Sequence, residues 1–193
     1  MIEPPPKDPT LQEAAEWMVR ALRDEEIPIL LGGRSAIDYQ GEYTGSVDVD
    51  LLIGADFKGA NDALGVYVSR GDLFPAGATE GSVVRYLVSG WRAVDVMDVS
   101  DVDARLFRAL SRRASVPIRF GSAGEVRAVT REGYFVLAIL IGKRGFARRK
   151  ADPMAKVREA WGLFGARTDR RGVERLLAEL GEPDALKEAL AVP

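Results

Sequence analysis

A glycine pair and an Asp-x-Asp motif constrain this chain more than any other feature of its sequence. Gly32 and Gly33 end an apolar run that begins at Ile29, and Asp48 and Asp50 alternate with apolar residues in the next run. Glycine has no Cβ, so the backbone can turn sharply there and a ligand can approach the main chain. Residues two apart on a strand point to the same face, so the two acids project together. We therefore predict two strands joined around a site.

The pairing of the two acids predicts a cation site. Carboxylates a few Å apart repel each other, and a hard cation such as Mg²⁺ removes that repulsion. A helix that starts at about Arg34 to Ser35 would direct its free N–H groups and its dipole toward an anion. The alternative is a half-exposed strand with solvated acids, which is common in antiparallel sheets. The two motifs together favour a site for phosphates and divalent metal.

The composition narrows the available chemistry. The chain has 193 residues, 47% of them hydrophobic, which suits one globular domain or a domain with a small appendage. It has no cysteine and no histidine, which excludes disulfides, thiolate zinc sites, cysteine nucleophiles and histidine bases. A formal net charge of -2 gives no global attraction to nucleic acid, so such a partner needs a local basic patch.

Nothing in the sequence predicts a membrane location. No apolar run approaches the roughly 20 residues that span a bilayer. The acidic, proline-rich start is unlike a signal peptide. We therefore expect no membrane partner and a cytoplasmic location.

Hydrophobic periodicity and turn residues predict the order of the elements. We expect a helix capped by Thr10 and ending near Asp24, a helix over 34–39, a helix over 57–69 and a helix from Asp101 or Asp103 to about 113. Expected strands are 27–31, 47–53, the hairpin arms 83–88 and 91–96, and 118–120 and 126–129. Three further helices should start at Thr130, Asp152–Pro153 and Thr168, with a stop at Gly181.

This order predicts an α/β (α+β) fold with a mixed β-sheet flanked by helices and a helical C-terminal part. Residues 1–9 contain four prolines and should form a flexible arm. Residues 10–130 would be the α/β core, and residues 131–193 the helical part. The change near Thr130 marks either a subdomain edge or a point within one continuous domain.

A third acid lies in the second hairpin arm or directly after it, since Asp95 and Asp98 compete for a place in the site. Alternation puts Asp95 and Met97 on one face of the strand and Asp98 on the other with its apolar neighbours. One acid should therefore lie at the site and the other near the strand end or in a cap. We favour Asp95, which lies inside the arm.

The residues quoted above resemble the nucleotidyltransferase superfamily related to DNA polymerase beta. Its pattern is a strand, a Gly-Gly turn, a helix, a strand with Asp-x-Asp and a later strand with one more Asp. The segments 133–143 and 148–152 are similar to the helix that ends in Lys, and to the basic-acidic segment after it, in the small nucleotidyltransferases that include type IV toxin–antitoxin toxins. The resemblance covers roughly 27–161.

The resemblance implies a two-metal reaction in which a nucleoside triphosphate gives its nucleoside monophosphate to a hydroxyl acceptor and releases pyrophosphate. Asp48 and Asp50 would bind both ions, which are Mg²⁺ or Mn²⁺. Asp95 would help to bind one ion and assist deprotonation of the acceptor. The implied nucleotide contacts are Gly32, Gly33, Arg34, Ser35, Ser46, Lys143 and Lys150. For the basic stretch that holds Lys143 and Lys150, the alternative is a solvated helix end.

The acceptor and the partners remain open at the level of the sequence. The resemblance implies an NTP substrate, a tRNA or other RNA end or a protein hydroxyl as acceptor, and an antitoxin protein as partner. An antibiotic nucleotidyltransferase differs from this only in its acceptor. A catalytically silent member that binds nucleotide or a partner protein is the alternative from a different functional class.

Overall fold

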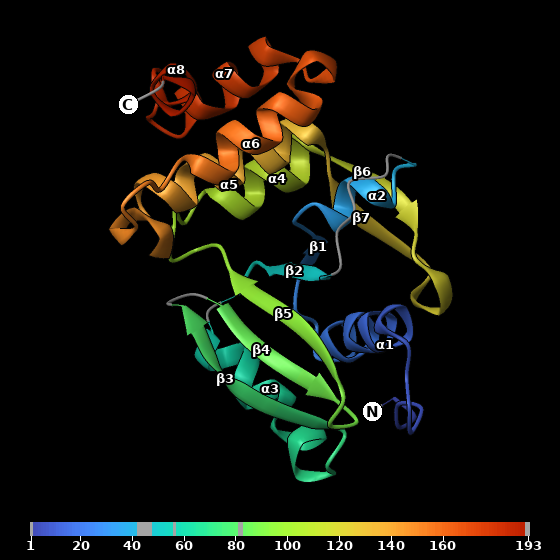
Figure 1. Ribbon diagram of the computed structural model, residues 1–193. Coiled ribbons are helices and arrows are strands. Elements are labelled where there is room, and N and C mark those ends of the chain that lie inside the picture. Colours follow the sequence, from blue (N-terminus) through green and yellow to red (C-terminus); the bar gives the residue numbers. More distant parts are fainter. Residues whose placement is uncertain (1, 42–47, 56, 81–82, 192–193) are drawn as a thin grey trace.

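The computed structural model describes residues 2–41, 48–55, 57–80 and 83–191 (Figure 1). One mixed sheet of seven strands has the order β3-β4-β5-β2-β1-β7-β6. The strands are β1 (Ile29–Leu31), β2 (Asp50–Ile53), β3 (Leu73–Glu80), β4 (Val83–Val88), β5 (Arg92–Asp98), β6 (Ser115–Arg119) and β7 (Glu125–Val129). The helices are α1 (Leu11–Asp24), α2 (Ser35–Asp38), α3 (Phe57–Ser69), α4 (Leu106–Arg113), α5 (Arg131–Lys143), α6 (Ala155–Phe164), α7 (Arg170–Glu179) and α8 (Ala185–Leu190). The predicted α/β fold with a mixed, helix-flanked sheet is confirmed.

The centre of the sheet consists of the two strands predicted around the glycine pair. Strand β1 pairs antiparallel with β2, and Leu31 lies opposite Leu51. Strand β2 begins only at Asp50, so Asp48 precedes the strand, and the predicted strand start at residue 47 lies outside the described residues. All three remaining residues of β2 are buried, because neighbouring elements cover both of its faces.

The predicted hairpin of β4 and β5 is confirmed and supplies the next strands of the sheet. Ser89 and Gly90 both have positive φ, at 51° and 77°, and Val88 pairs with Arg92. Three residues therefore connect the arms, one more than predicted, and β5 begins at Arg92 instead of at residue 91. Strand β5 then pairs in parallel with β2, which places Asp95 opposite Asp50. The third member of this layer, β3, was not predicted: Pro75 interrupts its pattern, and the strand is an edge strand with register shifts.

Two helices cover the sheet as their apolar periods predict. Helix α1 starts with a capping box in which Thr10 and Glu13 satisfy each other's backbone N–H groups. Its Trp17 packs edge-to-face on Tyr67 of α3, with ring centroids 5.5 Å apart. Helix α3 has the predicted bounds, despite the two glycines inside it.

The helices after β7 gather at one end of the molecule (Figure 1). Thr130 caps α5 as predicted, and Gly181 ends α7 with a φ of +85°. Four α-helices lie in this part of the described chain, whereas we predicted three. The fourth, α8, has six residues, too few for a periodic pattern.

Residues 2–9 contain no helix or strand and lie against the rest of the chain. The indole Nε1 of Trp17 donates to the Glu3 carbonyl oxygen at 2.8 Å, and Arg92 Nε donates to the Pro9 carbonyl oxygen at 2.8 Å. Among the described residues, no helix is long and apolar enough to cross a bilayer.

Candidate functional site

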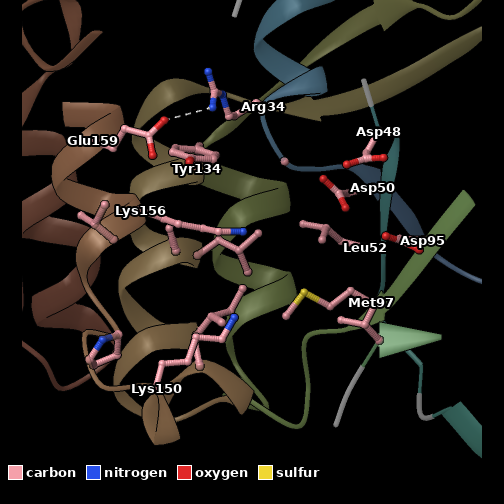
Figure 2. A pocket seen from close by; sticks show the side chains of 18 of the residues that line it. Arg34, Asp48, Asp50, Leu52, Asp95, Met97, Tyr134, Lys150, Lys156 and Glu159 are labelled. Carbon is pink, nitrogen blue, oxygen red and sulfur yellow. Dashed lines mark ion pairs between the residues drawn. The ribbon is translucent and has the colours of Figure 1, made fainter. Parts of the chain in front are cut away.

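A pocket with a cavity volume of about 710 Å³ lies between the central strands and helices α5 and α6 (Figure 2). Its volume is in the usual range for small-molecule sites. One wall bears acids, the opposite wall bears lysines, and apolar side chains lie between them. The lining residues are Gly33, Arg34, Asp48, Asp50, Leu52, Val83, Arg85, Asp95, Met97, Tyr134, Leu137, Ala138, Ile141, Ala147, Lys150, Asp152, Pro153, Lys156, Val157 and Glu159.

The acidic wall consists of the three aspartates that the sequence analysis selected. Asp50 and Asp95 are register partners on β2 and β5, and Asp48 lies just ahead of β2. Burial, together with the negative charges of Asp95 and Asp48, raises the pKa of Asp50 to about 6. Lys156 and Arg85 act in the opposite direction on that pKa but do not cancel the rise. The ionised form of Asp50 therefore lowers the free energy of unfolding.

Gly33 allows the turn after β1 to lie against Asp50. Its φ is +62°, and a Cβ built on it would lie 1.8 Å from Asp50 Oδ2. The neighbouring Gly32 donates its N–H to the Asp50 carbonyl oxygen at 2.8 Å, which fixes the turn to the start of β2. No side chain larger than hydrogen fits at Gly33 unless the carboxylate moves.

Asp95 is held by a bidentate ion pair with Arg85 on the neighbouring strand. Arg85 Nε lies 2.7 Å from Asp95 Oδ1, and a terminal guanidinium nitrogen lies 2.7 Å from Oδ2. The hydrogen bonds and charge of Asp95 raise the pKa of Arg85 above its usual range, and the charges of Asp48 and Asp50 add to this. Arg85 was not selected from the sequence: the predicted two-residue turn would pair it with Val94, whereas the observed register pairs it with Asp95.

The second acid of β5, Asp98, lies away from the pocket. It is buried, and its Oδ1 accepts hydrogen bonds from the Ser100 backbone N–H at 2.8 Å and from the Ser100 hydroxyl at 2.6 Å. Asp98 therefore stabilises the turn after β5, while Asp95 and Met97 line the pocket.

The opposite wall carries two lysines together with two acids, Asp152 and Glu159. Lys150 and Lys156 extend into the cavity from the helical layer (Figure 2). Within the described part of the chain, Lys156 has neither a hydrogen-bonding nor an ion-pair partner, and its charge acts on Asp50 across the cavity. Sequence reasoning missed Lys156, because only the packing of α6 on α5 brings it to the pocket, across from the acids.

The other predicted nucleotide contacts lie at different places. Arg34 lines the pocket, where a guanidinium nitrogen lies 3.6 Å from a Glu159 carboxylate oxygen. Ser35 is buried, and its hydroxyl donates to the Gly32 carbonyl oxygen at 3.1 Å, so it is not among the pocket residues. Ser46 lies outside the described residues.

Lys143 also lies outside the set of pocket residues. Its Nζ is 2.7 Å from a Glu182 carboxylate oxygen and 2.6 Å from one of Glu188. These two hydrogen bonds raise the pKa of Lys143 above its ordinary value of 10.5. In this structure Lys143 ties α5 to the segment that holds α8, and its predicted contact with phosphate stays a prediction.

The acidic wall fits a hard cation in residue type and in charge. Burial, and then repulsion by Asp95 and Asp48, raise the pKa of Asp50, and a bound divalent ion would relieve the repulsion. However, no three acids of the described residues gather closely enough to form a ready cation site, and Arg85 holds both oxygens of Asp95. Asp48 and Asp50 line the same wall without belonging to the Arg85 fork, and a metal ion at Asp95 would need Arg85 to move first.

Comparisons with known proteins agree with this architecture. No family model and no curated protein matches the chain. The chain is similar to an antigenic nucleotidyltransferase-like protein from Paracoccidioides brasiliensis, at 16% identity and a TM-score of 0.51, over 93% of this chain and 91% of the other. It is also similar to the antibiotic-resistance factor ANT(2'')-Ia in solution, at 16% identity and a TM-score of 0.55, over 92% and 94% of the two chains. The crystal structure of ANT(2")-Ia with adenylyl-2"-tobramycin gives 14% identity and a TM-score of 0.55, over 90% and 98%.

These similarities define the class of fold. The chain has the nucleotidyltransferase fold over nearly its whole length, as the resemblance of its motifs implied. At 14–16% identity the comparison describes the fold, and the activity has to be argued from the site itself. The similarity to toxin–antitoxin proteins stays a prediction.

Proposed function

We propose that this protein is a metal-dependent nucleotidyltransferase that moves a nucleoside monophosphate from an NTP to a hydroxyl acceptor and releases pyrophosphate. The observation that supports this best is the pocket in which three aspartates on the nucleotidyltransferase fold lie opposite two lysines. Such a cavity offers carboxylates for metal and cations for phosphate within one volume. Transfer of a nucleotidyl group needs both kinds of group and needs no histidine.

Each wall has its own role in this proposal. Asp48 and Asp50 would hold Mg²⁺ or Mn²⁺, with Asp95 contributing to a second ion. The bound ions would neutralise charge on the triphosphate and on the leaving pyrophosphate. Lys156 and Lys150, which extend into the cavity, would bind the phosphates as flexible point cations. The carboxylate of Asp95 is the acid of this wall that would accept the proton of the acceptor hydroxyl.

The Gly33 turn would position the nucleotide by allowing close approach. Because Gly33 has no Cβ, its main chain lies against the Asp50 carboxylate, so a phosphate held by a metal ion on Asp50 would come close to this turn. Arg34 lines the same end of the pocket, and its contact with Glu159 is exposed, so that the guanidinium can exchange this partner for a phosphate at little cost.

The charges around the pocket favour an RNA end as the acceptor. Arg148 and Arg149 are exposed immediately before Lys150, which lines the pocket. In the described part of the chain, the two pocket acids outside the aspartate wall are already paired, Asp152 with Arg158 and Glu159 with Arg34.

A polycationic aminoglycoside would have to compete with Arg158 and Arg34 for these two acids and with bound metal ions for the three aspartates. A polyanion instead meets a basic rim that continues from the pocket to the surface. The affinity for such an acceptor should fall as salt rises, because phosphate binding releases counterions.

A transfer assay tests the proposal. The protein is incubated with Mg²⁺ and each NTP labelled in the α-phosphate, with total tRNA, an aminoglycoside or no added acceptor. We expect label in the RNA, no label with Asp48→Ala, and full transfer with the matched control Asp62→Ala, which removes an exposed acid on α3. Absence of label from RNA, antibiotic and the protein itself would contradict the proposal.

A further inference from the structure

Arg85 occupies the carboxylate of Asp95 in a way that leaves little room for another cation. Both oxygens accept from the guanidinium at 2.7 Å, which is the planar fork geometry of strong arginine–carboxylate pairs. The Asp95 side chain is 15% exposed and that of Arg85 is 39% exposed. The pair is thus partly shielded on the acid side and open to solvent on the arginine side.

The sheet holds Arg85 beside the acids. Arg85 of β4 is the register partner of Asp95 of β5, and Asp95 is the register partner of Asp50 of β2. The three residues thus form one row across three adjacent strands, and all of them line the pocket. Arg85 is the positively charged side chain of this row.

We propose that Arg85 is a removable counter-ion at Asp95, so that the two metal positions of the site fill in order. This inference rests on the proposed function. Asp48 and Asp50, which line the pocket and do not belong to the Arg85 fork, would hold the first ion. The second ion requires Asp95 and has to displace the guanidinium of Arg85. Once released, the Arg85 guanidinium can pair with the phosphates of a bound triphosphate. NTP binding therefore favours the release of Arg85 and strengthens binding of the second ion.

The consequence for the enzyme is a site that assembles fully only with its nucleotide. Without NTP, Arg85 neutralises Asp95 and the second metal position stays weak. With NTP, the phosphates offer the guanidinium a new partner of the same chemical kind as the carboxylate it leaves. Metal binding and nucleotide binding are then reciprocal, since each strengthens the other by the same factor.

Binding of Mn²⁺ to the full chain without nucleotide tests this order, with free Mn²⁺ measured by electron paramagnetic resonance. For the wild type we expect one bound ion and a second ion at least about tenfold weaker. Arg85→Gln should strengthen the second ion by about tenfold, and Arg85→Lys should give an intermediate value because lysine cannot form the fork. The control Arg112→Gln removes an exposed charge of α4 outside the pocket and should match the wild type.

The possible results separate the inference from the function on which it rests. If Arg85→Gln and Arg112→Gln bind Mn²⁺ alike, Arg85 does not control the second position and the inference is wrong. If Arg85→Gln fails to fold, an Arg85→Lys protein with wild-type Mn²⁺ binding overturns the inference equally. If no variant and no wild-type sample binds Mn²⁺, even with a non-hydrolysable NTP, the proposed function fails and the inference fails with it.

Discussion

Replacement of Asp50 by Asn should stabilise the fold while it abolishes nucleotidyl transfer. Asp50 is partly buried beside two other acids, and its pKa is raised from an ordinary value of 3.8 to about 6. The folded protein therefore binds this proton more tightly than the unfolded chain does. It follows that the contribution of Asp50 to the free energy of unfolding falls as the pH rises from about 3.8 to about 6 and stays low above that.

The magnitude follows from the size of the shift. A rise of about two pKa units corresponds to about 3 kcal/mol at 1.36 kcal/mol per unit. Asn has the shape of the acid and no charge, so Asp50→Asn should raise the free energy of unfolding by about 3 kcal/mol at pH 8 and by roughly half of that at pH 5. For a chain of this length, the gain at pH 8 equals about 6–12 °C in Tm.

Urea unfolding followed by circular dichroism, with a metal chelator present, measures this difference at both pH values. The control Asp62→Asn removes an exposed charge on α3 and should change the free energy of unfolding by less than about 0.5 kcal/mol. If Asp50→Asn is less stable than the wild type at pH 8, or if the difference does not depend on pH, the acid wall is not held at an electrostatic cost and the reasoning is refuted.

Three further substitutions test separate parts of the structure. Gly33→Ala should lower the free energy of unfolding by about 1–3 kcal/mol, measured in urea, because φ is +62° and the new Cβ would lie 1.8 Å from Asp50 Oδ2; a protein as stable as the wild type would contradict the tight turn. Lys156→Ala should weaken binding of a non-hydrolysable NTP about tenfold by calorimetry, whereas the exposed control Lys58→Ala on α3 should not, and equal affinities would remove Lys156 from the phosphate site. Arg144→Ala should lower the free energy of unfolding by about 1–2 kcal/mol, measured by thermal unfolding, because this guanidinium pairs with two acids and donates to a carbonyl oxygen. NTP binding should not change, since Arg144 lies outside the pocket; loss of NTP binding in a folded variant would show a role in the site.

Local sequence patterns were sufficient to predict much of the fold. The Thr10 and Thr130 caps place the starts of two helices and the Ser89-Gly90 turn places the end of β4, because each satisfies backbone groups through nearby residues. Strand β3 was missed, since Pro75 removes a backbone donor and edge strands tolerate this. Strand β3 forms because it pairs with β4, and this pairing is not indicated by the residues of β3 themselves.

For the site, too, local patterns predicted some residues, and others depend on contacts between distant parts of the chain. Alternation on β5 separates Asp95 from Asp98 correctly in space, since one lines the pocket and the other caps the turn after the strand. The lysines of the opposite wall were harder to predict, because Lys156 reaches the cavity only through the packing of α6 on α5. Lys143 has the motif position of a phosphate ligand but pairs with glutamates of the C-terminal segment. Tertiary contacts, and not spacing, decide which cations face the acids.

The fate of each phosphate of the NTP is the sharpest measure of the proposed reaction. The protein, Mg²⁺ and RNA are incubated with NTP labelled in the α-phosphate in one sample and in the γ-phosphate in another, and pyrophosphate is quantified in both. We expect the α-label in the RNA, the γ-label in pyrophosphate, and one pyrophosphate released for each nucleotide transferred. Transfer of the γ-label to the acceptor, or release of orthophosphate without any transfer, would contradict nucleotidyl transfer by this site.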